Sequence, residues 1–288
     1  MTERLASPLV ETDWLEKHLA DEDLRILDCA IIMKPNDDGT YGFVSGIELW
    51  QESHIPGSIH VDIQGQLSDQ EHAITLMMPA PETLAETLKA LGIGDENRVV
   101  IYDRGNHAWA ARVWWMLRAI GFDNAAVLNG SWPKWTEEGR PVSAEKQSYP
   151  PARNLTINPR PELFIDKQGV KDSLQQEDIL RRHSLPLTFY NGEVNAYKRP
   201  GRIPASHHLY CEEMLDSGSN CYVSVAEMAR IAKEKNLDPA KKVITYCGGG
   251  IAASSNALAL TMAGFDNIAV YDGSLTEWTS DPEMPMEE

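Results

Sequence analysis

The chain has 288 residues, of which 42% are hydrophobic and 24% are charged, and its formal net charge is −17. This length favours two domains, and the composition is that of a soluble globular protein. The acidic balance argues against nucleic-acid binding, which needs a basic surface. No apolar run approaches the roughly 20 residues that a membrane-spanning helix needs.

The cysteines and the N-terminal residues indicate where the protein is found. Four cysteines, Cys29, Cys211, Cys221 and Cys247, are scattered without a CxxC pair. This spacing argues against a zinc site and against a disulfide framework. The first residues include an early acidic side chain and no apolar signal core. We therefore expect a reduced, cytoplasmic setting.

Apolar runs at residues 24–29 and 99–103 predict buried strands in the first half of the chain. The second run ends at Asp103 and leads through a polar turn into an apolar helical stretch. That stretch is expected to stop at Gly121, because glycine commonly follows the last residue of a helix. A short strand and a tryptophan-bearing segment follow at residues 127–135.

Residues 146–160 are polar and contain Pro150, Pro151 and Pro159. Such a composition is typical of an extended linker. We therefore expect one domain at residues 1–145 and a second domain at residues 161–288.

The second half of the chain repeats the first. Residues 243–247 resemble residues 99–103, and residues 270–278 resemble residues 127–135. An Ile-Pro motif also occurs twice, as His54-Ile-Pro-Gly-Ser58 and as Arg202-Ile-Pro-Ala-Ser206. The repeated order of strand, turn, helix and strand predicts two α/β domains, each with a mainly parallel sheet flanked by helices.

The spacing of the two copies differs by one residue. Asp103 and Cys247 are separated by 144 positions, whereas Gly130 and Gly273 are separated by 143. One residue has therefore been lost from the second copy between the loop and the end of its helix.

Cys247 ends the strand of the second copy and is followed by a glycine-rich turn and a helix start: Gly248, Gly249, Gly250, Ile251 and Ala252. Backbone N–H groups at such a turn favour negative charge. We expect the N–H groups of these five residues, here called the anion cradle, to hold Cys247 as a thiolate. A buried structural cysteine is the alternative. The three consecutive glycines argue against it, because they free the backbone around an anion.

The Ile-Pro motifs, residues 112–118, the Asp272-Gly-Ser274 turn with Trp278, and the Cys247 loop together resemble the tandem-domain rhodanese-like sulfurtransferases. The resemblance covers nearly the whole chain. It implies two similar domains, the first inactive and the second carrying a sulfur-accepting cysteine. Asp103, at the position that matches Cys247, fits an inactive first domain.

The resemblance also implies the chemistry. The Cys247 thiolate would attack the outer sulfur of thiosulfate or 3-mercaptopyruvate and become a persulfide, whose sulfur then passes to cyanide or a thiol acceptor. The backbone N–H groups of the anion cradle would stabilise the charge at each stage. No metal or organic cofactor is implied.

The loop departs from both branches of the family. The thiosulfate branch typically has basic residues where this chain has Gly248 and Gly249. The mercaptopyruvate branch typically has hydroxyl side chains at the positions of Gly249 and Ala252. The usual substrate arginines are also replaced, by residues 191–193 and Tyr197.

An anionic donor still needs a positive partner. Arg199 and Arg202 lie just before or within the second Ile-Pro motif. We predict that they bind the donor, because a guanidinium matches the geometry of an oxyanion or carboxylate. The alternatives are a solvated basic loop, or Arg202 bracing the turn as His54 does in the first copy.

Two other functions fit the sequence less well. Cysteine phosphatases place an arginine six residues after the cysteine, where this chain has Ala253, so the phosphoryl charge would lack its partner. A non-catalytic rhodanese-like interaction module usually lacks the cysteine that is retained here. We therefore predict a cytoplasmic sulfurtransferase with a slight preference for thiosulfate and with 3-mercaptopyruvate as the alternative donor. Its expected partners are small molecules, not nucleic acid or membrane.

Overall fold

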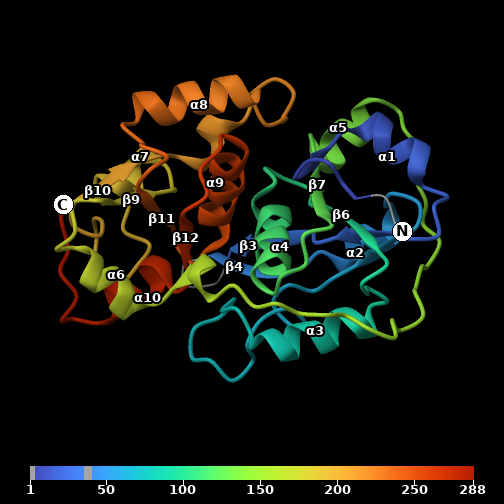
Figure 1. Cartoon of the computed structure of the whole chain (residues 1–288), viewed down its shortest axis with the longest axis horizontal. Helices are drawn as coiled ribbons and strands as arrows, with labels where there is room; N and C mark the ends of the chain where they lie inside the picture. Colours follow the sequence, from blue (N-terminus) through green and yellow to red (C-terminus); the bar gives the residue numbers. More distant parts are fainter. Residues whose placement is uncertain (1–3, 36–40) are drawn as a thin grey trace. The chain divides into compact units, whose positions relative to one another are not determined.

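The computed structural model describes residues 4–35 and 41–288 (Figure 1). These residues form two compact units. The first runs up to Glu71, continues over Met78–Arg160 and includes Ser217–Cys221. The second comprises His72–Met77, Pro161–Asp216 and Tyr222–Glu288. Each unit therefore includes a short segment from the other half of the sequence, which the internal repeat did not indicate.

The first unit is built on a parallel sheet with helices. Its strands lie in the order β1 (Leu9–Val10), β7 (Ala125–Leu128), β6 (Arg98–Tyr102), β2 (Leu24–Asp28) and β5 (Ser58–His60). Its helices are α1 (Thr12–His18), α2 (Ile47–Glu52), α3 (Pro81–Ala90), α4 (Ala108–Ala119) and α5 (Ser131–Glu137). A separate antiparallel pair joins β3 (Ile31–Pro35) to β4 (Tyr41–Ser45).

The second unit has a sheet of the same kind. Its strands lie in the order β10 (Ser206–His208), β9 (Ile179–His183), β11 (Lys242–Tyr246), β12 (Ile268–Tyr271) and β8 (Phe164–Ile165), all parallel to their neighbours. Its helices are α6 (Lys167–Ser173), α7 (Leu187–Tyr190), α8 (Val225–Glu234), α9 (Ile251–Met262) and α10 (Ser274–Ser280), with short 3-10 turns η1 (Pro161–Leu163) and η2 (Cys211–Met214).

The two sheets match strand for strand. In the first unit Asp28 lies opposite Tyr102, and in the second His183 lies opposite Tyr246. The central strands β6 and β11 are almost wholly buried, as expected for parallel strands that are covered on both faces. The predicted fold, mainly parallel sheets flanked by helices, is confirmed.

The Ile-Pro motif of each copy is fixed to the central strand by a tyrosine. The Tyr246 hydroxyl accepts the backbone N–H of Ile203 at 3.2 Å and lies 2.6 Å from the Ser206 hydroxyl. Tyr102 makes the matching contacts with Ile55 and Ser58 in the first copy. Because each tyrosine is the last residue of its central strand, the motif positions the residue that follows it, Asp103 in one unit and Cys247 in the other.

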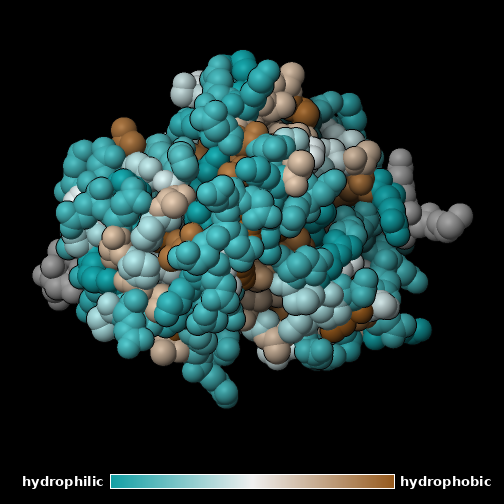
Figure 2. All heavy atoms as spheres, turned by 60° about the vertical axis from the view of Figure 1, so that its left-hand side comes forward, coloured by the Kyte–Doolittle hydropathy of each residue, from teal (hydrophilic) through white to brown (hydrophobic). Residues whose placement is uncertain are grey.

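The face of the molecule in Figure 2 is mostly hydrophilic, with hydrophobic residues scattered over it. This agrees with the large number of acidic side chains, 43 Asp and Glu against 26 Lys and Arg. In the part of the chain that the structure describes, we find no helix with the length and apolar character needed to cross a membrane.

Candidate functional site

Cys247 lies between the end of β11 and the start of α9, and Figure 1 shows α9 beside these strands. The exposed fraction of Cys247 is 2%, so the residue is buried. Gly250 caps the N-terminus of α9 with a φ of +80°, a conformation that side-chain-bearing residues rarely adopt. Gly250 therefore lets the chain turn from β11 into α9 three residues after Cys247.

The start of α10 holds the loop from the other side. The Ser274 hydroxyl accepts the backbone N–H of Cys247 at 3.1 Å and that of Gly250 at 3.2 Å, and it donates to the Tyr271 carbonyl at 2.7 Å. The carbonyl of Gly248 in turn accepts both the N–H and the hydroxyl of Thr276. No pattern local to Ser274 in the sequence predicts this role. Its match with Ser131 in the repeat was the signal that could have revealed one.

The backbone N–H groups of Ile251, Ala252 and Ala253 lie in the first turn of α9. Groups at this place have no carbonyl partner within their own helix, and Ser254 is the first residue of the turn to donate to a preceding carbonyl, that of Gly250. Together with the helix dipole they form a site for negative charge next to Cys247.

In the first copy, the side chain of Asp103 occupies the equivalent anion site. One Asp103 oxygen accepts the N–H groups of Gly105 at 2.9 Å and His107 at 3.3 Å. The other accepts those of Trp109 and Ala110, each at 3.2 Å. A carboxylate therefore lies where α4 begins, and it takes up the amides that an external anion would need.

The residue missing from the second copy lies in the turn itself. His107 and Gly250 are the equivalent N-caps of α4 and α9, and both have positive φ. The cap follows Asp103 by four positions but follows Cys247 by only three. The loss that the repeat indicated is therefore placed before the helix, where it shortens the loop around the thiol.

Arg199 and Arg202 form hydrogen bonds within the second unit. The Arg199 guanidinium donates to the carbonyls of four residues at the C-terminal end of the chain, Trp278, Thr279, Asp281 and Met284. Arg202 donates to the Tyr190 carbonyl at 3.1 Å, pairs with Glu287 at 2.5 Å and lies over the Tyr190 ring. These contacts tie the segment before β10 to the C-terminal residues.

His183 occupies the position in β9 that Asp28 occupies in β2. It is fully buried, and its ring lies 5.1 Å from the Tyr246 ring and 6.5 Å from that of His208. Burial, followed by the charge of His208, lowers the pKa of His183 to about 3. The residue is thus a neutral imidazole at physiological pH.

The other cysteines are thiols without disulfide partners. Burial, followed by the charges of Asp103 and Asp28, raises the pKa of Cys29 well above its ordinary value. Burial, followed by the charges of Glu212 and Cys247, raises the pKa of Cys211. Both groups therefore stay protonated and lack the thiolate that nucleophilic attack requires. No cluster of three or more metal-ligating side chains occurs within residues 4–35 and 41–288.

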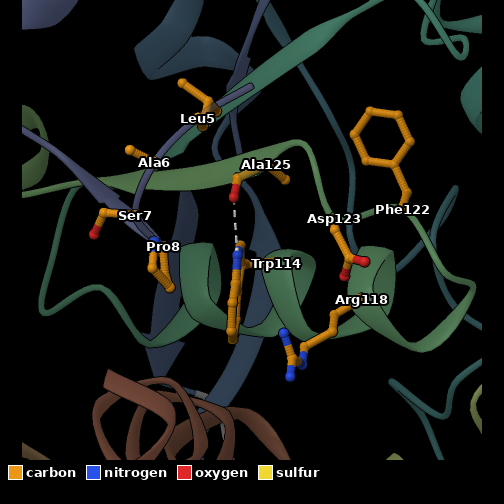
Figure 3. Close-up of a pocket in the computed structure, with 9 residues that line it drawn as sticks. All are labelled: Leu5, Ala6, Ser7, Pro8, Trp114, Arg118, Phe122, Asp123 and Ala125. Carbon is orange, nitrogen blue, oxygen red and sulfur yellow. Dashed lines mark hydrogen bonds between the residues drawn. The ribbon is translucent and has the colours of Figure 1, made fainter. Parts of the chain in front are cut away.

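A pocket of about 100 Å³ lies in the first unit (Figure 3). It is lined by Leu5, Ala6, Ser7, Pro8, Trp114, Arg118, Phe122, Asp123 and Ala125. The Trp114 indole donates to the Ala125 carbonyl at 3.0 Å, which fixes the ring between the helix and the strand (Figure 3). None of the lining residues belongs to the Cys247 loop, so this pocket is separate from the candidate site.

Fold and sequence together define the class of the protein. The rhodanese-like domain family matches residues 11–138 and 192–281, one segment in each half of the chain. The chain belongs to this family and is a tandem-domain rhodanese-like sulfurtransferase.

Named relatives share nearly the whole length of the chain. Thiosulfate/3-mercaptopyruvate sulfurtransferase 2 of Arabidopsis thaliana is 30% identical over 97% of this chain and 86% of its own length. The 3-mercaptopyruvate sulfurtransferase of Escherichia coli K12 is 27% identical over 96% and 97%. The thiosulfate sulfurtransferase of Gallus gallus is 28% identical over 95% and 94%.

Solved structures show the same fold. The E. coli 3-mercaptopyruvate sulfotransferase structure matches with a TM-score of 0.82 and 26% identity over 93% of this chain and 99% of that one. The anaerobic ergothioneine biosynthesis enzyme of Chlorobium limicola, solved with trimethyl histidine, matches with a TM-score of 0.83 and 25% identity. That match covers 99% of this chain and 71% of the other.

Proposed function

We propose that Cys247 is the nucleophile that takes sulfane sulfur from thiosulfate and passes it to cyanide or a thiol acceptor. The supporting observation is the match between the two loops. The Asp103 carboxylate cannot form a persulfide, but it accepts four backbone N–H groups at the start of α4. Cys247 stands at the same place before α9, where an anionic sulfur takes the role of that carboxylate.

The two steps balance in atoms and charge. The Cys247 thiolate attacks the outer sulfur of thiosulfate, the sulfur–sulfur bond of the donor breaks, and sulfite leaves with the bonding pair. Cys247 then carries a persulfide anion. Cyanide attacks the outer sulfur of that persulfide, thiocyanate leaves, and the thiolate is restored. The backbone N–H groups of Gly248, Gly249, Ile251 and Ala252 stabilise the charge in each state, whereas that of Gly250 already donates to the Ser274 hydroxyl.

3-Mercaptopyruvate is the second candidate donor. In that reaction the Cys247 thiolate attacks the single thiol sulfur of the donor, and the carbon–sulfur bond breaks with its electron pair on carbon. That carbon takes up the thiol proton, so pyruvate leaves and Cys247 carries the persulfide anion. Two observations favour it: the loop residues 247–252 carry no cationic side chain for a dianion, and the E. coli relative is named for this donor. Comparing kcat/KM for thiosulfate and 3-mercaptopyruvate on the same preparation decides between the donors.

The substrate-binding role of Arg199 and Arg202 stays a prediction. The four carbonyls around Arg199 favour a role in holding the polypeptide, because each occupies an N–H that an anion would need. Replacing each arginine by alanine and measuring the KM of both donors tests the direct role. An unchanged KM, together with a lowered melting temperature, would exclude substrate contact.

The nucleophile itself is tested by mass. Incubation with donor and no acceptor should add one sulfur atom to the intact chain, and the peptide that contains Cys247 should carry it. Cys247→Ser should take up no sulfur, whereas Cys221→Ser, which changes a half-buried thiol of the first unit, should behave like the parent. Thiocyanate formation by Cys247→Ser at the parent rate would disprove the mechanism.

We further propose a cytoplasmic location and small-molecule donors and acceptors as the partners, with no cofactor. The free state of all four cysteines supports a reducing compartment. Fractionation of the source cells, with the chain followed by antibody, tests the location.

A further inference from the structure

Tyr197 lies in the segment between α7 and β10. Its half-buried ring packs against the core of the second unit, which includes Tyr246, Tyr271 and Trp278. The Phe189 ring lies 6.3 Å away at an angle of 57°. The ring is thus held by packing.

The hydroxyl of Tyr197 lies against the loop that follows Cys247. A Cβ atom placed on Gly248 would lie 2.1 Å from the Tyr197 hydroxyl oxygen and 3.1 Å from the ring carbon that bears it. Gly248 therefore provides the space that the phenol occupies. Gly248 is thus required because the Tyr197 ring approaches its backbone closely, whereas Gly250 is required because its φ is positive.

The Tyr197 hydroxyl is a proton donor for which the described residues supply no acceptor. No hydrogen bond joins it to any residue within the described ranges 4–35 and 41–288. Burial, followed by the charge of Cys247, raises the pKa of Tyr197, so the phenol keeps its proton at neutral pH. The hydroxyl oxygen is not among the fully buried polar atoms that lack a partner, so it keeps access to solvent beside the loop and can donate to a bound anion there.

The tyrosine is also fixed relative to the loop through α10. At its start this helix accepts the loop amides on the Ser274 hydroxyl. Carbonyls of its last turn and of the segment that follows it accept the guanidinium of Arg199. Arg199 is two residues from Tyr197. α10 therefore contacts both the Cys247 loop and the segment that contains Tyr197. Arg199 acts as a positioning residue for Tyr197.

We propose that the Tyr197 hydroxyl donates a hydrogen bond to the sulfur-borne charge at Cys247, first on the bound donor and then on the outer sulfur of the persulfide. This inference rests on the proposed role of Cys247. It makes Tyr197 a catalytic residue and gives the site an uncharged side-chain donor in place of a guanidinium. A phenol has one directed proton, so it recognises a single anionic atom.

Tyr197→Phe removes the oxygen and keeps the ring. A hydrogen bond to a charged group corresponds to a loss of roughly tenfold to hundredfold in kcat/KM for the donor. The rate at which a preformed persulfide reacts with cyanide should change as well, which a purely structural contact would not cause. Tyr190→Phe is the matched control, because that hydroxyl donates to the Ser206 carbonyl at 2.9 Å; its kcat/KM should stay within about twofold.

Gly248→Ala provides a second test of the contact. The added methyl group should displace the Tyr197 hydroxyl and lower kcat/KM, and the loss should be smaller when the substitution is made in the Tyr197→Phe background. Additive losses would show that the two groups do not meet.

The outcomes separate this inference from the proposed function. If the parent protein forms the persulfide on Cys247 and Tyr197→Phe retains its full kcat/KM and cyanide rate, the Tyr197 role is overturned alone. If the parent forms no persulfide on Cys247, the proposed mechanism fails, and the role of Tyr197 fails with it.

Discussion

The two loops of this protein place different groups at the same structural position. In the first, the Asp103 carboxylate accepts four backbone N–H groups and completes its own anion site. In the second, Cys247 stands at that position, the turn is one residue shorter, and the Tyr197 hydroxyl lies against the backbone. The backbone builds an anion site in both copies, and in the proposed mechanism the side chain at this one position decides whether the loop can accept sulfur.

Placing the first-copy residue in the second loop should have the largest effect. Cys247→Asp should lower sulfur transfer by on the order of a thousandfold or more, because a carboxylate cannot form the persulfide. The chain should nevertheless be more stable than Cys247→Ala by about 1 kcal/mol, because the carboxylate accepts the amides of α9. Thiocyanate assays and urea unfolding measure the two effects. An aspartate variant less stable than the alanine variant would show that the two anion sites are not equivalent.

Removing the carboxylate from the first copy should affect stability and not activity. Asp103→Ala removes the acceptor of four backbone N–H groups, two of them in buried hydrogen bonds, so we expect a loss of about 3 kcal/mol in the free energy of unfolding. Asp69→Ala is the control, because the partly exposed Asp69 carboxylate accepts the N–H of Glu71 in a local turn. A fall in kcat/KM measured well below the melting temperature would contradict the separation of roles.

The matched positions Asp28 and His183 should give the second unit a dependence on pH. An unfolded histidine titrates near pH 6.5, whereas burial lowers the pKa of His183 to about 3. Below pH 6.5 the unfolded chain binds a proton that the folded chain does not bind. Stability is therefore complete above about pH 6.5 and falls as the pH drops toward 3.

Between pH 7 and pH 5 this one group should account for roughly 2 kcal/mol of lost stability. His183→Gln should reduce the pH dependence of urea unfolding by that amount, while the contribution of other buried histidines remains. Equal slopes for the variant and the parent would mean that His183 takes up its proton in the folded state.

The two serines that hold the loops should give the smallest effects. Ser131 and Ser274 occupy matching positions in the repeat. The Ser131 hydroxyl accepts the N–H of Asp103, and the Ser274 hydroxyl accepts the N–H of Cys247. Replacement by alanine should cost about 1 kcal/mol of stability in each case. Only Ser274→Ala should lower kcat/KM, by about threefold to tenfold, because Ser274 orients the loop of the proposed nucleophile. Equal kinetic losses for both variants would remove the distinction between the copies.

Much of the fold could be predicted from sequence because the signals are local. Apolar runs at residues 99–103 and 243–247 predicted β6 and β11, and the repeat predicted two related sheets. The exchanged segments Ser217–Cys221 and His72–Met77 could not be predicted, because each lies between elements and carries no periodic pattern. Their membership of the opposite unit depends on long-range packing.

The candidate site was predicted in part. The glycines after Cys247 indicated a backbone anion site, and the repeat placed Asp103 at the matching position. Arg199 and Arg202 were predicted to bind the donor from charge and proximity in sequence alone. Sequence does not show that four carbonyls surround Arg199, since these come from residues about 80 positions away.

The sequence by itself determined the family, the duplication and the identity of the candidate nucleophile, because these depend on residue types at fixed local spacings. The tertiary structure decided which groups meet around that nucleophile. Tyr197 reaches Gly248 across about 50 positions, and Ser274 reaches Cys247 across 27. Such contacts depend on the parallel order of β9, β11 and β12 and on the placement of α10, which no local pattern encodes.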